Sequence, residues 1–424
     1  MNDNQLTISQ WSLILVLFLM QVFAFGFPVF SLPFVYSGAI EEFGWTRQEA
    51  VLLTSFKFYV SAVAALIVGR LLDIVNPKYV VGASAFFGVL AMAGFLLADN
   101  LFVYYSLGIL LGLNGTGMAV SVNVIVSRSF EKATGTILGI VLSGTSVAGM
   151  VLPIIMAPLM VTIGWRTAMA FLSCGIWLLA LPVWLVLSRK GSLIDTRLGK
   201  QSDSESKTGM WNHMKKLSMT RDFWLIFIGV FMVMGVDQAL VQNQVLFLQS
   251  EKGLNLGMVA WGASLLAGMG IGAKVLFGLL FDRLSILGIT ICYLSLAVSV
   301  GLSFTVTGVV SMLAFMTVRG IAHGGLIVAG PVLLKHRYGV QNLGINLGIF
   351  MLATSIGFGF CPSFMANLAD NSGSYSGAFA LGTAAVFVAA ILLLPVKPLK
   401  REKLFNDQLT INNKQSAGGQ KKGL

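Results

Sequence analysis

Charged residues and cysteines are scarce in this sequence. Only 11% of its 424 residues are charged, whereas ordinary soluble domains carry about 25%. So low a content excludes a soluble globular enzyme. The three cysteines, Cys174, Cys292 and Cys361, each lie inside an apolar run, which excludes an extracytoplasmic disulfide framework and a Cys-x-x-Cys metal site.

Motifs of nucleotide hydrolysis and of metal or nucleophilic catalysis are also missing. The sequence has no Gly-x-x-x-x-Gly-Lys-Ser/Thr phosphate loop, no His-Glu-x-x-His and no Gly-x-Ser-x-Gly. We therefore expect no enzyme activity, no cofactor and no metal. Any movement of a solute would have to draw its energy from gradients rather than from ATP.

Long apolar runs are what the sequence does contain. Mean hydropathy is +0.84, and a helix of about 20 apolar residues spans the ~30 Å hydrocarbon core of a bilayer. The sequence therefore predicts an all-α, multi-pass membrane protein with twelve transmembrane helices. They are expected near 11–36, 50–69, 79–97, 102–126, 136–160, 167–188, 223–248, 258–281, 288–305, 309–334, 343–368 and 377–396.

A polar segment divides these runs into two sets of six. It is rich in Ser, Lys and Asp, so it cannot cross the bilayer and is expected to link two domains. The prediction is an N-terminal six-helix bundle at 1–188, a cytoplasmic linker at 189–222, a C-terminal six-helix bundle at 223–398 and a basic cytoplasmic tail at 399–424.

The distribution of Lys and Arg predicts the orientation. Of the 28 Lys and Arg residues, three (Arg47, Arg166 and Lys252) fall opposite the termini, three fall inside spans, and the remainder lie on the side of the termini and linker. By the positive-inside rule both termini are cytoplasmic, in an inner or plasma membrane. The net charge of +11 is thus explained by the lipid bilayer, and we expect no nucleic-acid partner.

The two halves of the sequence repeat each other. A single ungapped offset of 209 residues aligns many identities, among them Gly26 with Gly235, Glu42 with Glu251, Gly44 with Gly253, and Gly164 with Gly373. The offset makes span seven the counterpart of span one. We therefore expect two bundles of the same orientation, related by a pseudo-twofold axis along the membrane normal.

Two loop segments carry a family resemblance. Gly69-Arg70-Leu71-Leu72-Asp73 and Gly278-Leu279-Leu280-Phe281-Asp282-Arg283 resemble the Gly-x-x-x-Asp-(Arg/Lys) signature of the major facilitator superfamily. The resemblance implies that fold, with substrate bound near the midplane between the halves and access alternating as they rock. It also implies that Asp73, Asp282 and Arg283 help to lock the inward gate.

Other motifs look like the monocarboxylate-porter branch, which includes animal lactate carriers and the bacterial oxalate:formate antiporter. In that branch a cation eight residues before the loop aspartate pairs with the substrate carboxylate. Lys274 stands in that place, while Gly270 stands where the lactate carriers keep a proton-coupling aspartate. The motifs are Glu42-Phe43-Gly44-Trp45-Thr46-Arg47, Ser127-Arg128-Ser129-Phe130, Gly135-Thr136-Ile137-Leu138-Gly139-Ile140 and Gly164-Trp165-Arg166.

Cations inside spans also indicate an anion site. A charge at the bilayer centre costs about 2.5 to 3.5 kcal/mol, so each needs a partner or a use. Lys274 lies about 12 Å from the cytoplasmic end of its span and Arg319 about 15 Å from the outer end of its own, both near mid-depth. Two cations at one depth repel unless an anion lies between them. Permanent pairs with Asp237 or with backbone carbonyls are the alternative.

Further polar residues are candidates for coupling and for the pocket. Asp237 is the acidic residue well inside a span. It could pair with Arg319 or Lys57 in one state and be protonated or released in another, although a static salt bridge would look the same in sequence. His323 could relay a proton. Asn114, Gln238 and Gln242 complete the predicted substrate-binding set.

We interpret the sequence as a monomeric secondary transporter of a small organic anion, a monocarboxylate or a related acid. Transport would be symport or antiport, with H⁺ or a counter-anion as the coupled species. In one alternative the same fold carries a neutral or cationic compound, as in drug or metabolite efflux, and Asp237 recognises it. In another the chain is a receptor or scaffold that transports nothing.

Overall fold

The computed structural model describes residues 8–130, 134–189, 215–339 and 343–398, and every regular element in these ranges is a helix. The first half comprises α1 (Ile8–Leu19), a π-helical segment η1 (Met20–Gly26), α2 (Phe27–Phe43), α3 (Arg47–Ile74), α4 (Pro77–Gly94) with a 3₁₀ turn η2 (Phe95–Leu97), α5 (Leu101–Ser129) and α6 (Thr134–Arg189). The second comprises α9 (Arg221–Leu246) with a π-helical η3 (Phe247–Glu251), α10 (Leu256–Leu284), α11 (Ile286–Leu302) with a 3₁₀ turn η4 (Ser303–Thr305), α12 (Val309–Tyr338), α13 (Leu343–Ser372) and α14 (Tyr375–Leu393).

Eleven of the described helices are long and apolar enough to cross a membrane. The difference from the expected twelve lies in α6. Its 56 residues would extend about 84 Å, far beyond a ~30 Å core. Gly164 interrupts the helical backbone with φ +77° and ψ 160°, so α6 contains the predicted fifth and sixth spans in succession. The predicted linker and basic tail lie largely outside the described residues.

The repeat seen in the sequence recurs in backbone geometry. Gly44 and Gly253 have φ of +68° and +65°, and Gly164 and Gly373 have φ of +77° and +76°. These left-handed values favour glycine because a Cβ would be strained there. Equivalent glycines therefore end or break equivalent helices in the two halves.

Side-chain contacts repeat as well. Glu42 accepts a hydrogen bond from Trp165 Nε1 at 2.8 Å, next to the break in α6. Its counterpart Glu251 accepts from Ser374 Oγ at 3.0 Å and from the Tyr375 amide at 2.6 Å, next to the start of α14. Each acidic residue after the first span of its half thus anchors the start of the sixth.

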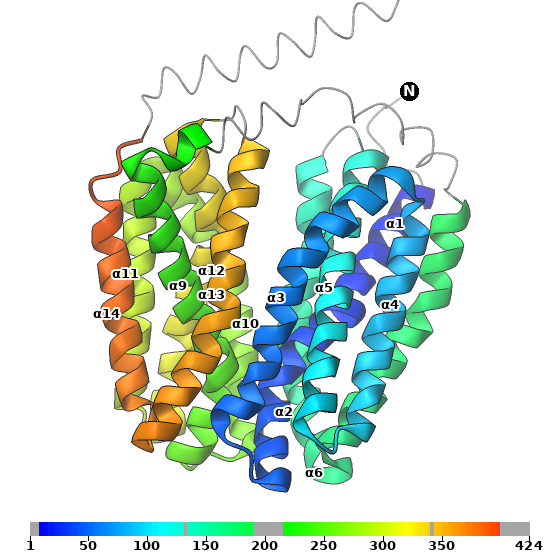
Figure 1. Cartoon of the computed structure of the whole chain (residues 1–424), viewed down its shortest axis with the longest axis horizontal. Helices are drawn as coiled ribbons and strands as arrows, with labels where there is room; N and C mark the ends of the chain where they lie inside the picture. Colours follow the sequence, from blue (N-terminus) through cyan, green and yellow to red (C-terminus); the bar gives the residue numbers. More distant parts are fainter. Residues whose placement is uncertain (1–7, 131–133, 190–214, 340–342, 399–424) are drawn as a thin grey trace, which may run out of the picture.

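The two halves form separate bundles that meet at one end (Figure 1). They converge at the end remote from the N-terminus and spread apart toward the end that carries it. Asp370 of α13 fastens the closed end, because its carboxylate oxygens accept hydrogen bonds from the backbone amides of Arg47 at 3.1 Å and Gln48 at 2.8 Å. An anion is favoured at a helix N-terminus, and here one bundle supplies the anion to a helix of the other.

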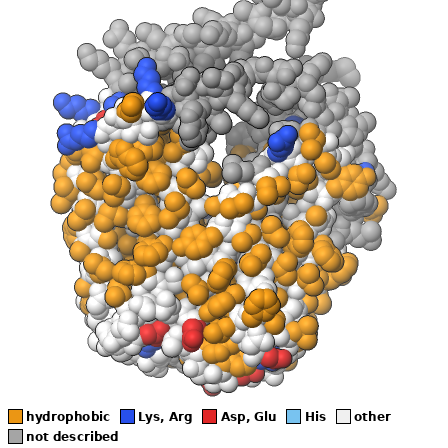
Figure 2. Space-filling view, in the orientation of Figure 1, with side chains coloured by type: hydrophobic (Ala, Val, Ile, Leu, Met, Phe, Trp, Pro, Cys, Tyr) orange, Lys and Arg blue, Asp and Glu red, His pale blue; other side chains and the backbone are white. Residues whose placement is uncertain are grey.

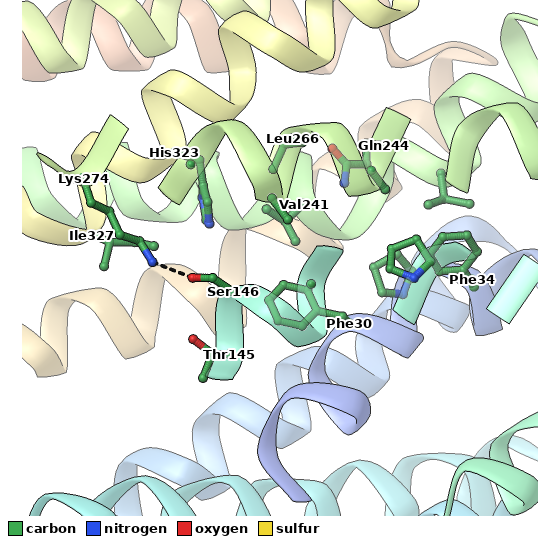
Figure 3. A pocket seen from close by; sticks show the side chains of 17 residues that line it. Phe30, Phe34, Thr145, Ser146, Val241, Gln244, Leu266, Lys274, His323 and Ile327 are labelled. Atoms are coloured by element: carbon green, nitrogen blue, oxygen red, sulfur yellow. Dashed lines mark hydrogen bonds between the residues drawn. The ribbon is translucent and has the colours of Figure 1, made fainter. Parts of the chain in front are cut away.

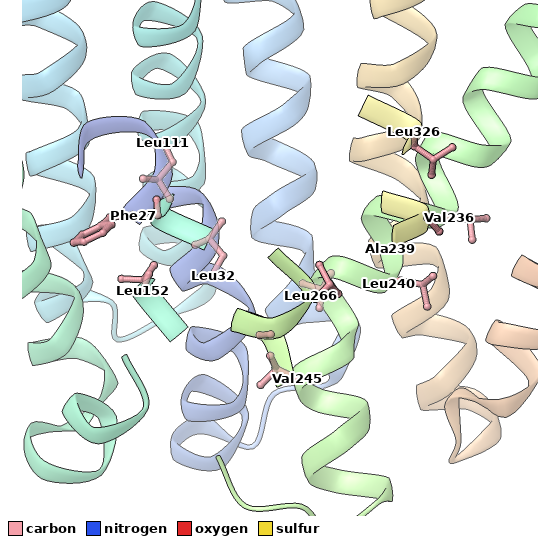
Figure 4. Close-up of a cluster of buried hydrophobic side chains, with 14 of the residues drawn as sticks. Phe27, Leu32, Leu111, Leu152, Val236, Ala239, Leu240, Val245, Leu266 and Leu326 are labelled. Atoms are coloured by element: carbon pink, nitrogen blue, oxygen red, sulfur yellow. The ribbon is translucent and has the colours of Figure 1, made fainter. Parts of the chain in front are cut away.

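The outer surface is suited to lipid. Figure 2 shows a broad apolar band between an end with basic side chains and an end with acidic ones. Interior apolar side chains pack within each bundle and where the bundles meet (Figure 4). Small residues bring helices close together at these crossings, as where a Cβ on Gly26 would collide with Ala148 and one on Gly235 with Cys361.

Candidate functional site

A cavity of about 80 Å³ lies between the two bundles (Figure 3). This volume is the space open to the centre of a water-sized sphere, of which a single water needs roughly 10 to 15 Å³. The cavity therefore suits a few waters or a small solute. Its walls come from both halves of the chain and from five helices, α2, α6, α9, α10 and α12. The lining residues are Phe30, Pro33, Phe34, Thr145, Ser146, Gly149, Pro153, Val241, Gln244, Val245, Ala263, Leu266, Ala267, Gly270, Lys274, His323 and Ile327. We call this space the central cavity.

Lys274 is the lysine among the lining residues, which include no arginine and no acidic residue. Its ammonium donates a hydrogen bond to Ser146 Oγ at 2.8 Å, from α10 of one bundle to α6 of the other. The side chain is partly buried, so its charge is screened less than on a surface. A carboxylate entering the cavity would find here an ammonium and a hydroxyl close together.

Glycines determine where Lys274 stands relative to α12. A Cβ at Gly324 would collide with the carbonyl oxygen of Gly270, and one at Gly320 with that of Leu266. The close approach of α10 and α12 places Lys274 and His323 on the wall of one cavity.

Behind this wall lies a buried cluster of three ionisable side chains. Arg319 Nη2 is 2.6 Å from Asp237 Oδ1 and also donates to the backbone oxygen of Asp237 at 2.8 Å. His323 Nδ1 is 2.8 Å from Asp237 Oδ2. Exposed fractions of the side chains are 0% for Arg319, 3% for Asp237 and 22% for His323, so His323 connects the buried pair to the central cavity.

Lys274 and Arg319, which were expected to surround one anion, face different neighbours in this structure. In this conformation Arg319 is directed at Asp237 on α9 and does not line the central cavity. Residue depth, which sequence spacing gives, does not specify which neighbour a side chain faces. The internal ion pair, which the sequence left open as the alternative, is the arrangement observed for Arg319.

The predicted amides lie elsewhere. Gln242 Oε1 accepts a hydrogen bond from the Tyr36 hydroxyl at 2.7 Å, across the closed end of the bundles. Asn114 Nδ2 donates to the Ser84 backbone oxygen at 2.9 Å inside the N-terminal bundle. Gln238 is buried on α9 without lining the central cavity. None of these three joins the cavity wall in this conformation.

Other predicted residues are likewise separate from the cavity wall. Lys57 is 3% exposed, and its ammonium has no hydrogen-bond partner within the described residues. Asp282 and Arg283 are exposed in the last turn of α10. Asp73 lies near the end of α3, and its side chain is outside the described part.

Sequence reasoning gave no binding role to three polar residues of the wall, Thr145, Ser146 and Gln244. Thr145 and Ser146 fitted better as helix-packing residues, because only the three-dimensional fold brings Ser146 to Lys274. Gln244 carried a detectable signal, since it follows Asp237 by seven residues and Val241 by three, the spacing of one helix face.

Known proteins match this chain over most of its length. A sequence family described as the Major Facilitator Superfamily matches residues 14–311 and 286–410. Monocarboxylate transporter 12 of Mus musculus is 24% identical over 351 residues, covering 74% of this chain and 71% of that protein. MFS transporter asaE of Aspergillus flavus is 22% identical over 338 residues, covering 76% and 73%.

Solved structures match the fold. The nucleoside transporter NupG superimposes with a TM-score of 0.72 at 13% identity, covering 92% of this chain and 99% of that one. A bacterial homologue of the human lysosomal transporter Spinster, in an inward-facing and unoccupied conformation, gives a TM-score of 0.69 at 16% identity, covering 92% and 96%. Sequence identities this low indicate a shared fold but do not indicate a shared substrate.

Proposed function

Because the chain belongs to the Major Facilitator Superfamily, we propose that it is a secondary transporter that moves a small organic anion by alternating access. The cargo is a monocarboxylate or a related acid. The observation that carries this proposal is the ammonium of Lys274 on the wall of the central cavity, next to Ser146 and without an acidic partner among the lining residues.

The charge balance around the cavity supports an anionic cargo. Asp237 and Arg319 neutralise each other behind the wall. The positive charge of Lys274 on the wall is therefore not compensated by an acidic side chain. A buried charge without a counter-ion is unfavourable, and a carboxylate would supply the counter-ion. One relative is named monocarboxylate transporter 12, which agrees with this cargo.

The same geometry weakens the alternative in which Asp237 recognises a neutral or cationic compound. Asp237 already contacts Arg319 and His323, and its side chain is only 3% exposed. A cationic cargo would have to displace Arg319 from it while approaching Lys274. Both steps are unfavourable electrostatically.

We further propose that the protein functions as a monomer and that the spread end faces the cytoplasm, since basic residues favour that side. The bundles at 1–188 and 223–398 would then rock about the cavity, with 189–222 as linker and 399–424 as tail. Asp73, Asp282 and Arg283 would pair across the bundles when that end closes.

Matched acids and amides test the proposed cargo. Benzoate and acetate are expected to raise the midpoint of thermal unfolding of the purified protein, whereas benzamide and acetamide, of similar shape, are not, because only the acids carry the charge that Lys274 pairs with. Uptake of the radiolabelled acids into proteoliposomes, with empty liposomes as the control, provides the flux. Equal action of acid and amide would contradict an anionic cargo. A lack of flux with every acid would favour the non-transporting alternative.

His323 is proposed as the coupling residue. Its Nδ1 faces Asp237, which leaves Nε2 available to the cavity. Asp237 on α9 contacts it, Lys274 on α10 lines the same cavity, and Arg319 lies one turn away on its own helix. An anion bound beside His323 favours the protonated imidazole, and by linkage a proton favours the anion.

Replacement of His323 by glutamine is expected to abolish acid accumulation driven by an inward proton gradient while sparing exchange of labelled for unlabelled acid. Exchange needs the cavity but no net proton movement. The matched control is His336→Gln, which changes a histidine on the same helix whose Nδ1 lies 2.9 Å from Ser285 Oγ, outside the cavity. Gradient-driven accumulation that survives in His323→Gln would rule out this coupling role.

A further inference from the structure

Gln244 is a buried amide on the wall of the central cavity, well separated from Lys274. Figure 3 shows Leu266 and Val241 between the two side chains. Gln244 is 6% exposed, and its Oε1 has no hydrogen-bond partner within the described residues. Among the described buried polar atoms without a partner, this is the one whose residue lines the cavity.

The amide oxygens of the two preceding residues on α9 do have partners, although Gln242 Nε2 has none within the described residues. Gln242 Oε1 accepts from Tyr36. Asn243 donates to the Pro362 backbone oxygen at 3.1 Å and accepts from the Tyr375 hydroxyl at 2.8 Å. These two amides join helices, whereas Gln244 faces the cavity. An unsatisfied buried polar group in a native protein calls for an explanation, and a ligand is one.

The positions of Gln244 on α9 and Lys274 on α10 show how far apart these two polar side chains lie along the cavity. Gln244 lies seven residues beyond Asp237, about 10 Å farther toward the closed end of the bundles. Gly270 of α10 packs on Gly324, next to His323, and so lies at about the level of Asp237. Lys274 is four residues past Gly270 and therefore lies on the other side of this level, toward the spread end of the bundles. The wall between is apolar, formed by Phe30, Val241 and Leu266 among others.

We propose that the transported anion is an elongated amphipathic carboxylate with a hydroxyl at the end remote from its acid group. The inference rests on the proposed function. The carboxylate binds Lys274 and Ser146, the apolar middle packs on Phe30 and Leu266, and the distal hydroxyl pairs with Gln244. A hydroxyl fits whichever way the amide is turned, because it both donates and accepts.

Three acids distinguish this cargo from simpler ones: acetate, hexanoate and 6-hydroxyhexanoate. In the parent protein, 6-hydroxyhexanoate is expected to compete with labelled acid at a concentration about fivefold to tenfold lower than hexanoate, the effect of one net hydrogen bond. Acetate is expected to be weaker than both because it leaves the apolar wall and Gln244 uncovered. Thermal stabilisation by each acid gives a second readout that does not depend on flux.

Gln244→Leu supplies the matched variant. It keeps the size of the side chain and removes the unpaired oxygen, so folding is expected to persist and the order of hexanoate and 6-hydroxyhexanoate is expected to reverse. The control is Gln249→Leu, which removes another amide oxygen without a described partner outside the cavity and is expected to keep the parental order.

The outcomes separate this inference from the proposed function. Hexanoate and 6-hydroxyhexanoate could compete equally in the parent and in Gln244→Leu, yet still depend on Lys274. That result would contradict the proposed distal hydroxyl and leave the proposed anion transport intact. The same holds if acetate competes best. If no acid competes or stabilises, the proposed function itself fails.

Discussion

Replacing Lys274 with glutamine is expected to reduce carboxylate uptake about 30-fold or more, because removing one partner of a buried charged hydrogen bond costs about 2 kcal/mol or more. Glutamine is one atom shorter than lysine but remains polar and uncharged, so the loss reports mainly the missing charge. The measurement is the initial rate of uptake into proteoliposomes, together with the thermal stabilisation that each acid provides.

Two companion variants make this result specific. Lys274→Arg retains the charge but changes its shape, so partial uptake is expected, with a preference among acids that differs from the parent. Lys252→Gln removes a cation near the closed end, outside the cavity, and is expected to leave uptake unchanged. If Lys274→Gln transports normally while Asp237→Asn does not, the cargo is neutral or cationic and the anion site is wrong.

The architecture of this protein was predictable because hydrophobic length and the repeat both act over many residues. Within a bilayer, a run of apolar residues has few ways to pair its backbone N–H and C=O groups in hydrogen bonds other than to form a helix. The offset that pairs Gly164 with Gly373 also located the helix breaks. What the sequence did not indicate is how straight the spans are, as in the π-helical segment Met20–Gly26 within the first.

The candidate site was only partly predictable, and Arg319 and His323 show why. They are four residues apart on α12, yet one is fully buried and the other reaches the cavity. Their spacing puts them on one side of a helix, but the rotation of that side toward α9 or toward the cavity depends on packing. Lys274, for which depth and family position agreed, lines the cavity, and its role in binding remains a proposal.

The pair of Arg319 and Asp237 gives the second large effect. Arg319→Met is expected to lower the free energy of unfolding by about 3 to 5 kcal/mol, because it leaves Asp237 buried without its cation. His323 remains as a partner but is charged only when protonated. The measurement is reversible unfolding in mixed detergent. The midpoint of thermal unfolding checks the order of stability of the parent and the variants.

A double-mutant cycle isolates the pair from the packing of either side chain. Asp237→Leu alone leaves Arg319 uncompensated, so it is also expected to destabilise, whereas the double variant Asp237→Leu with Arg319→Met removes both charges and is expected to lose much less than the sum of the two. Lys57→Gln is the contrasting control, since it removes a buried cation that contacts the Phe58 ring but has no acidic or hydrogen-bond partner within the described residues, and it is therefore expected to change stability far less. Additive losses in the cycle would mean that the two charges do not stabilise each other, and the assignment of Asp237 as a neutralised residue behind the cavity wall would have to be abandoned.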